Sequence, residues 1–97
     1  MSVFFEVKDK TNRTIRLTRE RWSHITTTHA EMTNYVLEIE YALCTPLKIT
    51  PHRKGNLSNY YAFIKQRKYP EKYLKVVVKY LNGHGFVITA HFVRHIQ

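Results

Sequence analysis

The sequence contains little cysteine, glycine or proline and lacks long apolar runs. It contains one cysteine, Cys44, which excludes an internal disulfide and favours a reducing compartment such as the cytoplasm. Its three glycines and three prolines, with 43% hydrophobic residues, are typical of a folded domain. No apolar run approaches membrane-spanning length, and residues 1–6 show no signal-peptide pattern. We therefore expect a single cytoplasmic domain over residues 1–97 with no membrane contact.

Acidic residues are scarce in the second half of the chain. Residues 1–40 hold six basic and six acidic side chains, whereas residues 41–97 hold ten basic ones and a single acid, Glu71. The whole net charge of +9 therefore arises after residue 40. Charge concentrated in this way indicates a polyanionic partner, either nucleic acid or an acidic protein. The alternative is a charge that serves solubility alone.

The hydrophobic pattern predicts an α+β domain. Thr18 can cap a helix that begins near Arg19 and weakens near His29, and a second helix is expected over residues 34–44. Strands are expected over residues 3–8, 14–17, 47–50, 60–65, 73–80 and 86–93. We expect an N-terminal hairpin, then two helices packed on one face of a four-stranded antiparallel sheet.

The last two strands form the strongest local signal, a hairpin with a glycine-rich turn. We favour a three-residue loop, 83–85, because such loops prefer a glycine at their last position. This register places Lys79 opposite Thr89 and brings His91 to the same face. A two- or four-residue loop would pair Val78 with Thr89 and put the lysines on the other face.

His29 ends the apolar stripe of the first predicted helix and should point toward the sheet. An imidazole there could transfer protons near neutral pH; the alternative is a core-edge histidine bonded to the backbone. Lys79 beside the Thr89 hydroxyl could stabilise a phosphorane-like transition state without a metal. The alternative for these strand residues is an ordinary charged sheet surface. The spacing of the histidines predicts no metal site.

Tyrosines and basic residues alternate between positions 60 and 73. Such a mixture of stacking and charge suits single-stranded nucleic acid, although some of these aromatics must pack in the strands. The residues are Tyr60, Tyr61, Lys65, Arg67, Lys68, Tyr69, Lys72 and Tyr73.

Short segments along nearly the whole chain form a recognisable series. They are Arg21-Trp22-Ser23-His24-Ile25, His29-Ala30-Glu31-Met32, Leu43-Cys44-Thr45-Pro46 with Ile49, Tyr60-Tyr61, residues 73–79 and residues 85–91. In this order they resemble the phage-type barnase–EndoU–colicin–RelE-like (BECR) nuclease family. The resemblance implies metal-independent RNA cleavage by attack of a 2′-hydroxyl on the adjacent phosphate. It also implies use in toxin–antitoxin systems, polymorphic toxins or phage proteins.

The same resemblance suggests roles for single residues. It makes His29 the helix histidine, Lys79 the strand lysine and Thr89 the strand hydroxyl. The sequence departs from the family at Ala30, where proline often follows the histidine, and at His91, where an aromatic residue is usual.

We therefore expect a toxin-like endoribonuclease that needs no cofactor or metal. His29 would be the general acid or base, with His91 as the second proton-transfer group. Lys79 would hold the scissile phosphate, Thr89 would orient it, and Tyr61 or Tyr60 would stack a base. The residues expected to bind RNA are Tyr60, Lys65, Arg67, Lys68 and Lys75.

Two other functions fit the same composition. One is a catalytically silent nucleic-acid-binding module on the same fold. The other is an interaction domain whose basic face binds an acidic antitoxin or inhibitor. RNA cleavage separates the enzyme from both, and salt-dependent binding of an oligonucleotide separates the module from the interaction domain.

Overall fold

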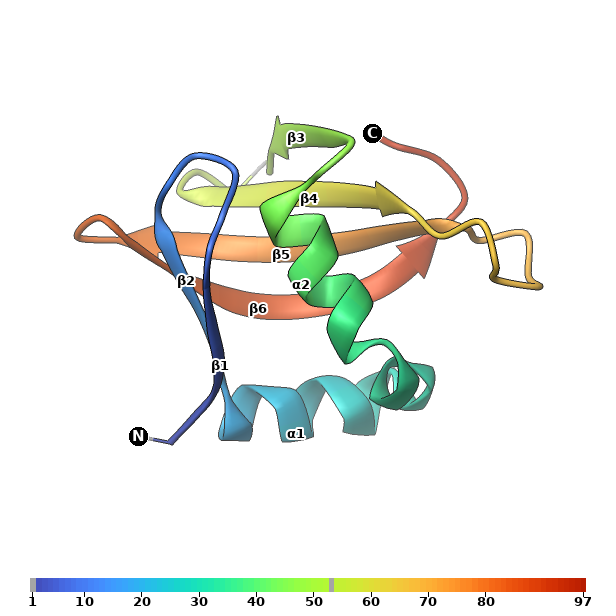
Figure 1. Cartoon of the computed structure of the whole chain (residues 1–97), viewed down its shortest axis with the longest axis horizontal. Helices are drawn as coiled ribbons and strands as arrows, with labels where there is room; N and C mark the ends of the chain where they lie inside the picture. Colours follow the sequence, from blue (N-terminus) through green and yellow to red (C-terminus); the bar gives the residue numbers. More distant parts are fainter. Residues whose placement is uncertain (1, 53) are drawn as a thin grey trace.

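The computed structural model describes residues 2–52 and 54–97, which form one α+β unit (Figure 1). Its sheet has six strands in the order β1-β2-β6-β5-β4-β3. The elements in chain order are β1 (Val3–Lys8), β2 (Thr14–Thr18), α1 (Arg19–Thr28), the short 3₁₀ helix η1 (Ala30–Asn34), α2 (Val36–Cys44), β3 (Lys48–Pro51), β4 (Leu57–Phe63), β5 (Tyr73–Leu81) and β6 (His84–Val93).

The α+β class is confirmed, but the expected four-stranded antiparallel sheet is wrong. The N-terminal hairpin joins the sheet, because β2 pairs in parallel with β6 and places Ile15 opposite Gly85. A Cβ at Gly85 would collide with Ile15 Cδ1 and press on Val78 Cγ1, so the absence of a side chain at Gly85 allows this close approach without a shift of Ile15. The sheet is therefore mixed, and β6 is an inner strand over this segment.

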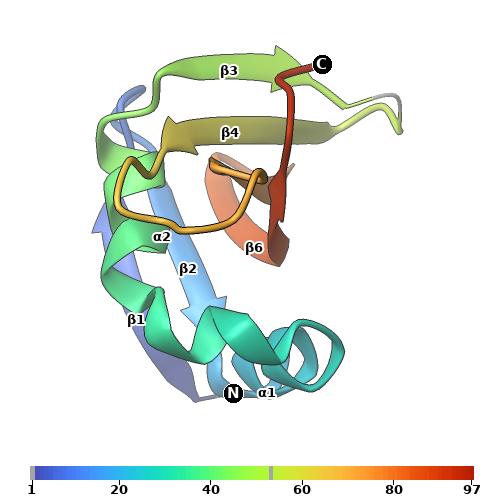
Figure 2. The same ribbon diagram turned by 90° about the vertical axis from the view of Figure 1, so that its right-hand side faces the viewer.

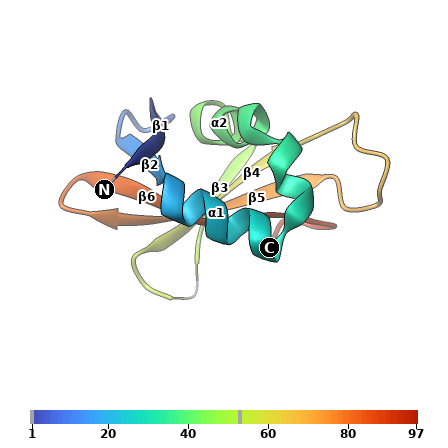
Figure 3. The same cartoon turned by 90° about the horizontal axis from the view of Figure 1, so that it is seen from below.

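Helix α1 forms where its local signals place it. The Thr18 hydroxyl accepts a hydrogen bond from the Arg21 backbone amide at 3.1 Å, and the amide of His29 closes the last turn by donating to Ile25. The helix runs along the β6 side of the sheet (Figures 1 and 3). His29 therefore stands at the end of α1, beside the sheet.

One face of the sheet is covered by α2 and carries the core (Figure 2). There β5 contributes Leu74, Val76 and Val78, which are all buried. They belong to the same apolar cluster as the buried helix residues Ile25, Met32, Ile39, Ala42 and Leu43. The odd-numbered residues of β5, among them Lys75 and Lys79, point to the opposite face, which we call the open face.

The expected register of the last hairpin is wrong. The turn has two residues, Asn82 and Gly83, both with positive φ (53° and 80°), as a type I′ turn requires. Lys79 consequently lies opposite Phe86, not Thr89. Asn-Gly is the strongest sequence signal for a two-residue hairpin turn, so the turn forms at Asn82 and Gly83 and not at residues 83–85.

An irregularity in the same hairpin decides which side chains reach the open face. The pairing shifts by one residue on β6 between Val78–Val87 and Val77–Thr89. Because side chains alternate, an extra residue turns everything beyond it to the other face. Thr89 and His91 therefore share the open face with Phe86 and with the lysines of β5.

Candidate functional site

Three neighbouring strands bring Tyr61, Lys75 and His91 into one row on the open face. Lys75 of β5 pairs with Tyr61 of β4 on one side and with His91 of β6 on the other. Directly opposed side chains in such pairs start about 5 Å apart. We call these three residues the open-face row.

His29 joins the open-face row from the end of α1. Its ring stacks on that of His91, with centroids 5.1 Å apart and planes inclined by 18°. The expectation that His29 points toward the sheet is confirmed. Two imidazoles and an ammonium group are thus gathered by a helix end and adjacent strands.

The open face also holds polar atoms that are buried without a partner. The Tyr61 hydroxyl, Asn59 Oδ1 and His91 Nδ1 have no hydrogen-bond partner among the described residues. Buried polar groups are normally paired, and leaving one unpaired costs roughly 1–3 kcal/mol. Three such atoms on one face are unusual for a purely structural surface, so they suggest a place adapted to a ligand.

The protonation of His91 is set by its surroundings. Burial lowers its pKa below the ordinary 6.5, and the charges of His29 and Lys75 lower the pKa further, whereas Glu31 raises it. The ring is therefore neutral at pH 7. A neutral imidazole beside a lysine can accept a proton from a hydroxyl group.

Lys79 and Thr89 do not meet. Lys79 is four residues along β5 from Lys75, about 13 Å away, with Leu57 and Phe86 as its cross-strand partners. Thr89 lies opposite Val77, one row from His91 on the same face. The strand lysine nearest the histidines is therefore Lys75, which the sequence suggested only as an RNA-binding residue.

Neither Tyr60 nor Tyr61 can stack a base in this conformation, because both side chains are 0% exposed. Tyr60 points to the helix-covered face, where its hydroxyl donates to Asp9 Oδ2 and shares a hydrogen bond with the Tyr80 hydroxyl. Burial and these bonds raise the pKa of Tyr60 far above its usual range. The expected stacking roles are wrong for this arrangement, and Tyr60 is part of the core.

Arg67 is also buried, at 6% exposure, and is not part of a free basic surface. Its Nε donates to the Glu71 carbonyl at 2.6 Å, its Nη2 donates to Glu31 Oε2 at 3.0 Å, and its guanidinium lies 3.7 Å from the centre of the Phe92 ring. Arg67 therefore fixes the β4–β5 loop against the segment that follows His29. Lys65 and Lys68 of the same loop are exposed.

No family model, no curated protein and no solved structure matches this chain. The resemblance to BECR nucleases stays a sequence-based expectation. No group of three or more His, Cys, Asp or Glu side chains that could hold a metal ion occurs within residues 2–52 and 54–97. In the same two stretches, no helix has the length and apolar content needed to cross a bilayer.

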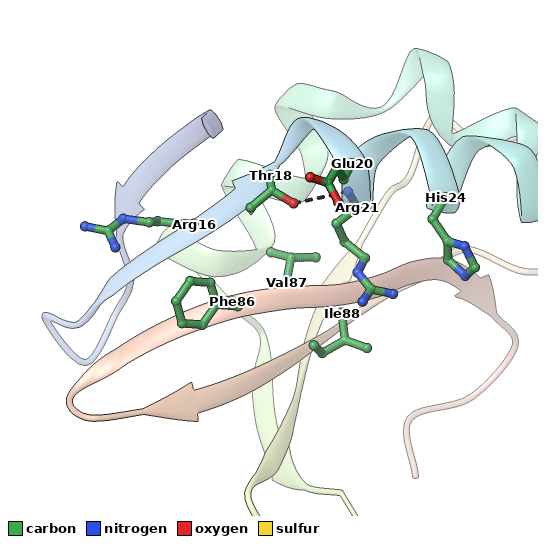
Figure 4. A pocket seen from close by; sticks show the side chains of 8 residues that line it. All are labelled: Arg16, Thr18, Glu20, Arg21, His24, Phe86, Val87 and Ile88. Carbon is green, nitrogen blue, oxygen red and sulfur yellow. Dashed lines mark hydrogen bonds between the residues drawn. The ribbon is translucent and has the colours of Figure 1, made fainter. Parts of the chain in front are cut away.

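Sequence reasoning missed a pocket between α1 and β6 (Figure 4). Arg21 and His24 line it from the helix, and Phe86 and Ile88 line it from the strand. The available signal was the three-residue spacing of Arg21 and His24, which puts both on one side of a helix. His24 is exposed.

Proposed function

We propose that this protein is a small metal-independent endoribonuclease that cleaves single-stranded RNA. The observation that carries the proposal is the gathering of His29, His91 and Lys75 on one face of a strongly basic protein. Cleavage next to a 2′-hydroxyl needs a base, an acid and a cation close to one phosphate. The open-face row and His29 contain all three.

The roles follow from the charge state of His91 and from the positions of His29 and Lys75. His91, neutral at pH 7, takes the proton of the 2′-hydroxyl while the 2′-oxygen forms a bond to phosphorus. The bond from phosphorus to the 5′-oxygen breaks, and His29 gives that oxygen a proton. Lys75 stabilises the negative charge that develops on the phosphate oxygens. The products are a 2′,3′-cyclic phosphate and a 5′-hydroxyl.

Other side chains of the open face support this chemistry. Thr89 lies next to the open-face row and orients the phosphate through its hydroxyl. The buried Tyr61 ring lies opposite Lys75 on the neighbouring strand and limits the positions that the lysine side chain can take. The enzyme would act in the reducing cytoplasm, with an acidic antitoxin or inhibitor as its regulating partner.

A catalytically silent nucleic-acid-binding module is the second candidate. The observation that favours it is that the ion pairs formed by the described residues involve Arg16, Arg67 and Arg94 and include no lysine. Lysines that no carboxylate neutralises are available to phosphates whether or not cleavage occurs.

Single-turnover cleavage of a fluorogenic single-stranded RNA tests the proposal. Wild-type protein should cleave it and leave a cyclic phosphate, with or without EDTA, and His91→Ala should lose roughly 10²- to 10⁴-fold in rate. His95→Ala, at an exposed histidine outside the site, is the matched control and should cleave normally. The matching 2′-deoxy substrate, which is DNA of the same base order, should resist cleavage.

Two results would contradict the nuclease. Cleavage of the 2′-deoxy substrate would show that a 2′-hydroxyl is not the attacking group. Wild-type RNA binding without cleavage would favour the silent module.

A further inference from the structure

The pocket between α1 and β6 arises where β2 leaves the sheet. Pairing of β2 with β6 ends at Arg16 and Phe86, and the chain then turns into α1 at Thr18. The space left between α1 and β6 has a volume of about 520 Å³. Its lining residues are Arg16, Thr18, Glu20, Arg21, His24, Phe86, Val87 and Ile88 (Figure 4).

The charges in this pocket are not equivalent. Arg16 is held by Glu6, with Nε 2.6 Å from the carboxylate oxygen, and Figure 4 shows it pointing away from the other basic side chains. Arg21 extends from α1 toward β6 near Ile88, and His24 follows on the same side of the helix (Figure 4). Arg21 forms no ion pair with another described residue. Its guanidinium is therefore free to bind an anion.

The strand side of the pocket is apolar and aromatic. Phe86 and Ile88 are partly exposed and line the pocket from β6, with Ile88 near Arg21 (Figure 4). A guanidinium and an aromatic ring that line the same pocket suit a ligand that carries both a phosphate and a planar base. A nucleotide has both groups.

The pocket and the open face share strand β6. Phe86 lies on the same face as Thr89 and His91, and Ile88 is three residues, about 10 Å, from His91. A single strand whose phosphate lies between His29 and Lys75 can therefore continue along β6 into the pocket. We propose that this pocket is a second RNA subsite, which binds a nucleotide flanking the scissile bond with its phosphate on Arg21 and its base against Phe86. That the ligand is RNA rests on the proposed function.

Binding is measured with a 2′-O-methyl RNA of about eight nucleotides, which cannot be cleaved by 2′-hydroxyl attack. Arg21→Gln should weaken its binding roughly 10-fold or more, as expected for one lost charged hydrogen bond, and should lower the salt dependence by about one phosphate contact. Arg19→Gln removes the same charge from the same helix outside the pocket, so it should bind nearly as wild type. Phe86→Leu keeps an apolar side chain but removes the ring, and it should also weaken binding.

A second readout uses substrate length. Arg21→Gln should reduce kcat/KM for the longer RNA and leave cleavage of a dinucleotide unchanged, because a dinucleotide at the histidines does not reach the pocket. Equal binding losses in Arg21→Gln and Arg19→Gln would overturn the subsite, since only general charge would then matter. Loss of binding in Arg21→Gln alone, from a protein that cleaves no RNA, would support the subsite while refuting the nuclease. Normal binding by Arg21→Gln, in a protein whose cleavage needs His91, would refute the subsite while supporting the nuclease.

Discussion

Tyr60 and Tyr61 are neighbours in the sequence, and both are completely buried, yet they belong to different chemical environments. Tyr60 faces α2 and shares its hydroxyl with Asp9 and Tyr80. Tyr61 faces the open side, and its hydroxyl has no partner among the described residues. The helix-covered face thus satisfies its buried hydroxyl, whereas the open face leaves the Tyr61 hydroxyl unpaired on the strand next to Lys75.

The two faces of the sheet differ in how completely their buried polar groups are paired. On the covered face a polar cluster is complete, since Asp9 Oδ1 also accepts from the amides of Thr11 and Arg13 at 2.9 Å each. Such closed networks rigidify a fold and leave nothing for a ligand. On the open face Asn59 Oδ1, the Tyr61 hydroxyl and His91 Nδ1 are buried without a partner among the described residues, which costs stability.

The sharpest test of the open face compares its two lysines. Lys75→Ala should slow single-turnover RNA cleavage roughly 10²-fold or more, because the charge beside the histidines is lost. Lys79→Ala removes the same charge about 13 Å along the strand and should leave the chemical step nearly unchanged. Circular dichroism verifies folding of both variants. A larger loss for Lys79→Ala would mean that the row around Lys75 is not the site.

The two tyrosines provide the matched test of stability. Tyr60→Phe leaves Asp9 and Tyr80 without their shared partner and should lower the free energy of unfolding by roughly 1–3 kcal/mol. Tyr61→Phe removes a hydroxyl that lacks a partner and should change stability by less than about 0.5 kcal/mol or increase it slightly. Urea denaturation at pH 7 measures both. An equal loss for the two variants would show that the Tyr61 hydroxyl is bonded in solution.

Local signals in the sequence were sufficient for α1 and for the identity of the open face. The Thr18 cap and the weak helix formers before His29 are local, and the structure begins and ends the helix there. Alternation along β5 put Lys75 and Lys79 on one face without any tertiary information. These features depend on residues a few positions apart, which sequence reasoning handles well.

The remainder depends on distant contacts. The parallel pairing of β2 with β6 places Gly85 opposite Ile15, seventy positions earlier in the chain. From the sequence, Gly85 was expected to lie in the turn of the last hairpin. The register shift that turns His91 toward Lys75 has no clear local signature. The pocket beside Arg21 exists because two strands diverge, which the order of residues does not reveal.

His91 makes the open face sensitive to pH. Its pKa is lowered in the folded protein, so the folded state resists protonation more than the unfolded state does. The contribution to stability is complete above the ordinary value of 6.5 and is lost as pH falls through the lowered folded pKa. We expect the urea midpoint to fall on acidification, and less steeply in His91→Asn. The acid limb of kcat/KM should lie below pH 6.5 for the same reason. Identical pH profiles of stability for the two proteins would contradict the lowered pKa.

The smallest expected effect concerns the edge of the open face. Lys68 is exposed in the β4–β5 loop and lies outside the open-face row, so Lys68→Ala should weaken RNA binding only a few-fold. If it contacts one phosphate of a single strand, the slope of log affinity against log salt should fall by about 0.7. The rate of the chemical step at saturating protein should not change, because Lys68 touches neither the histidines nor Lys75. Lys10→Ala, at an exposed lysine of the charge-balanced first half, is the control and should bind as wild type. Equal slopes for Lys68→Ala, Lys10→Ala and wild type would show that Lys68 contacts no phosphate. The RNA would then be confined to the open face and the pocket beside it.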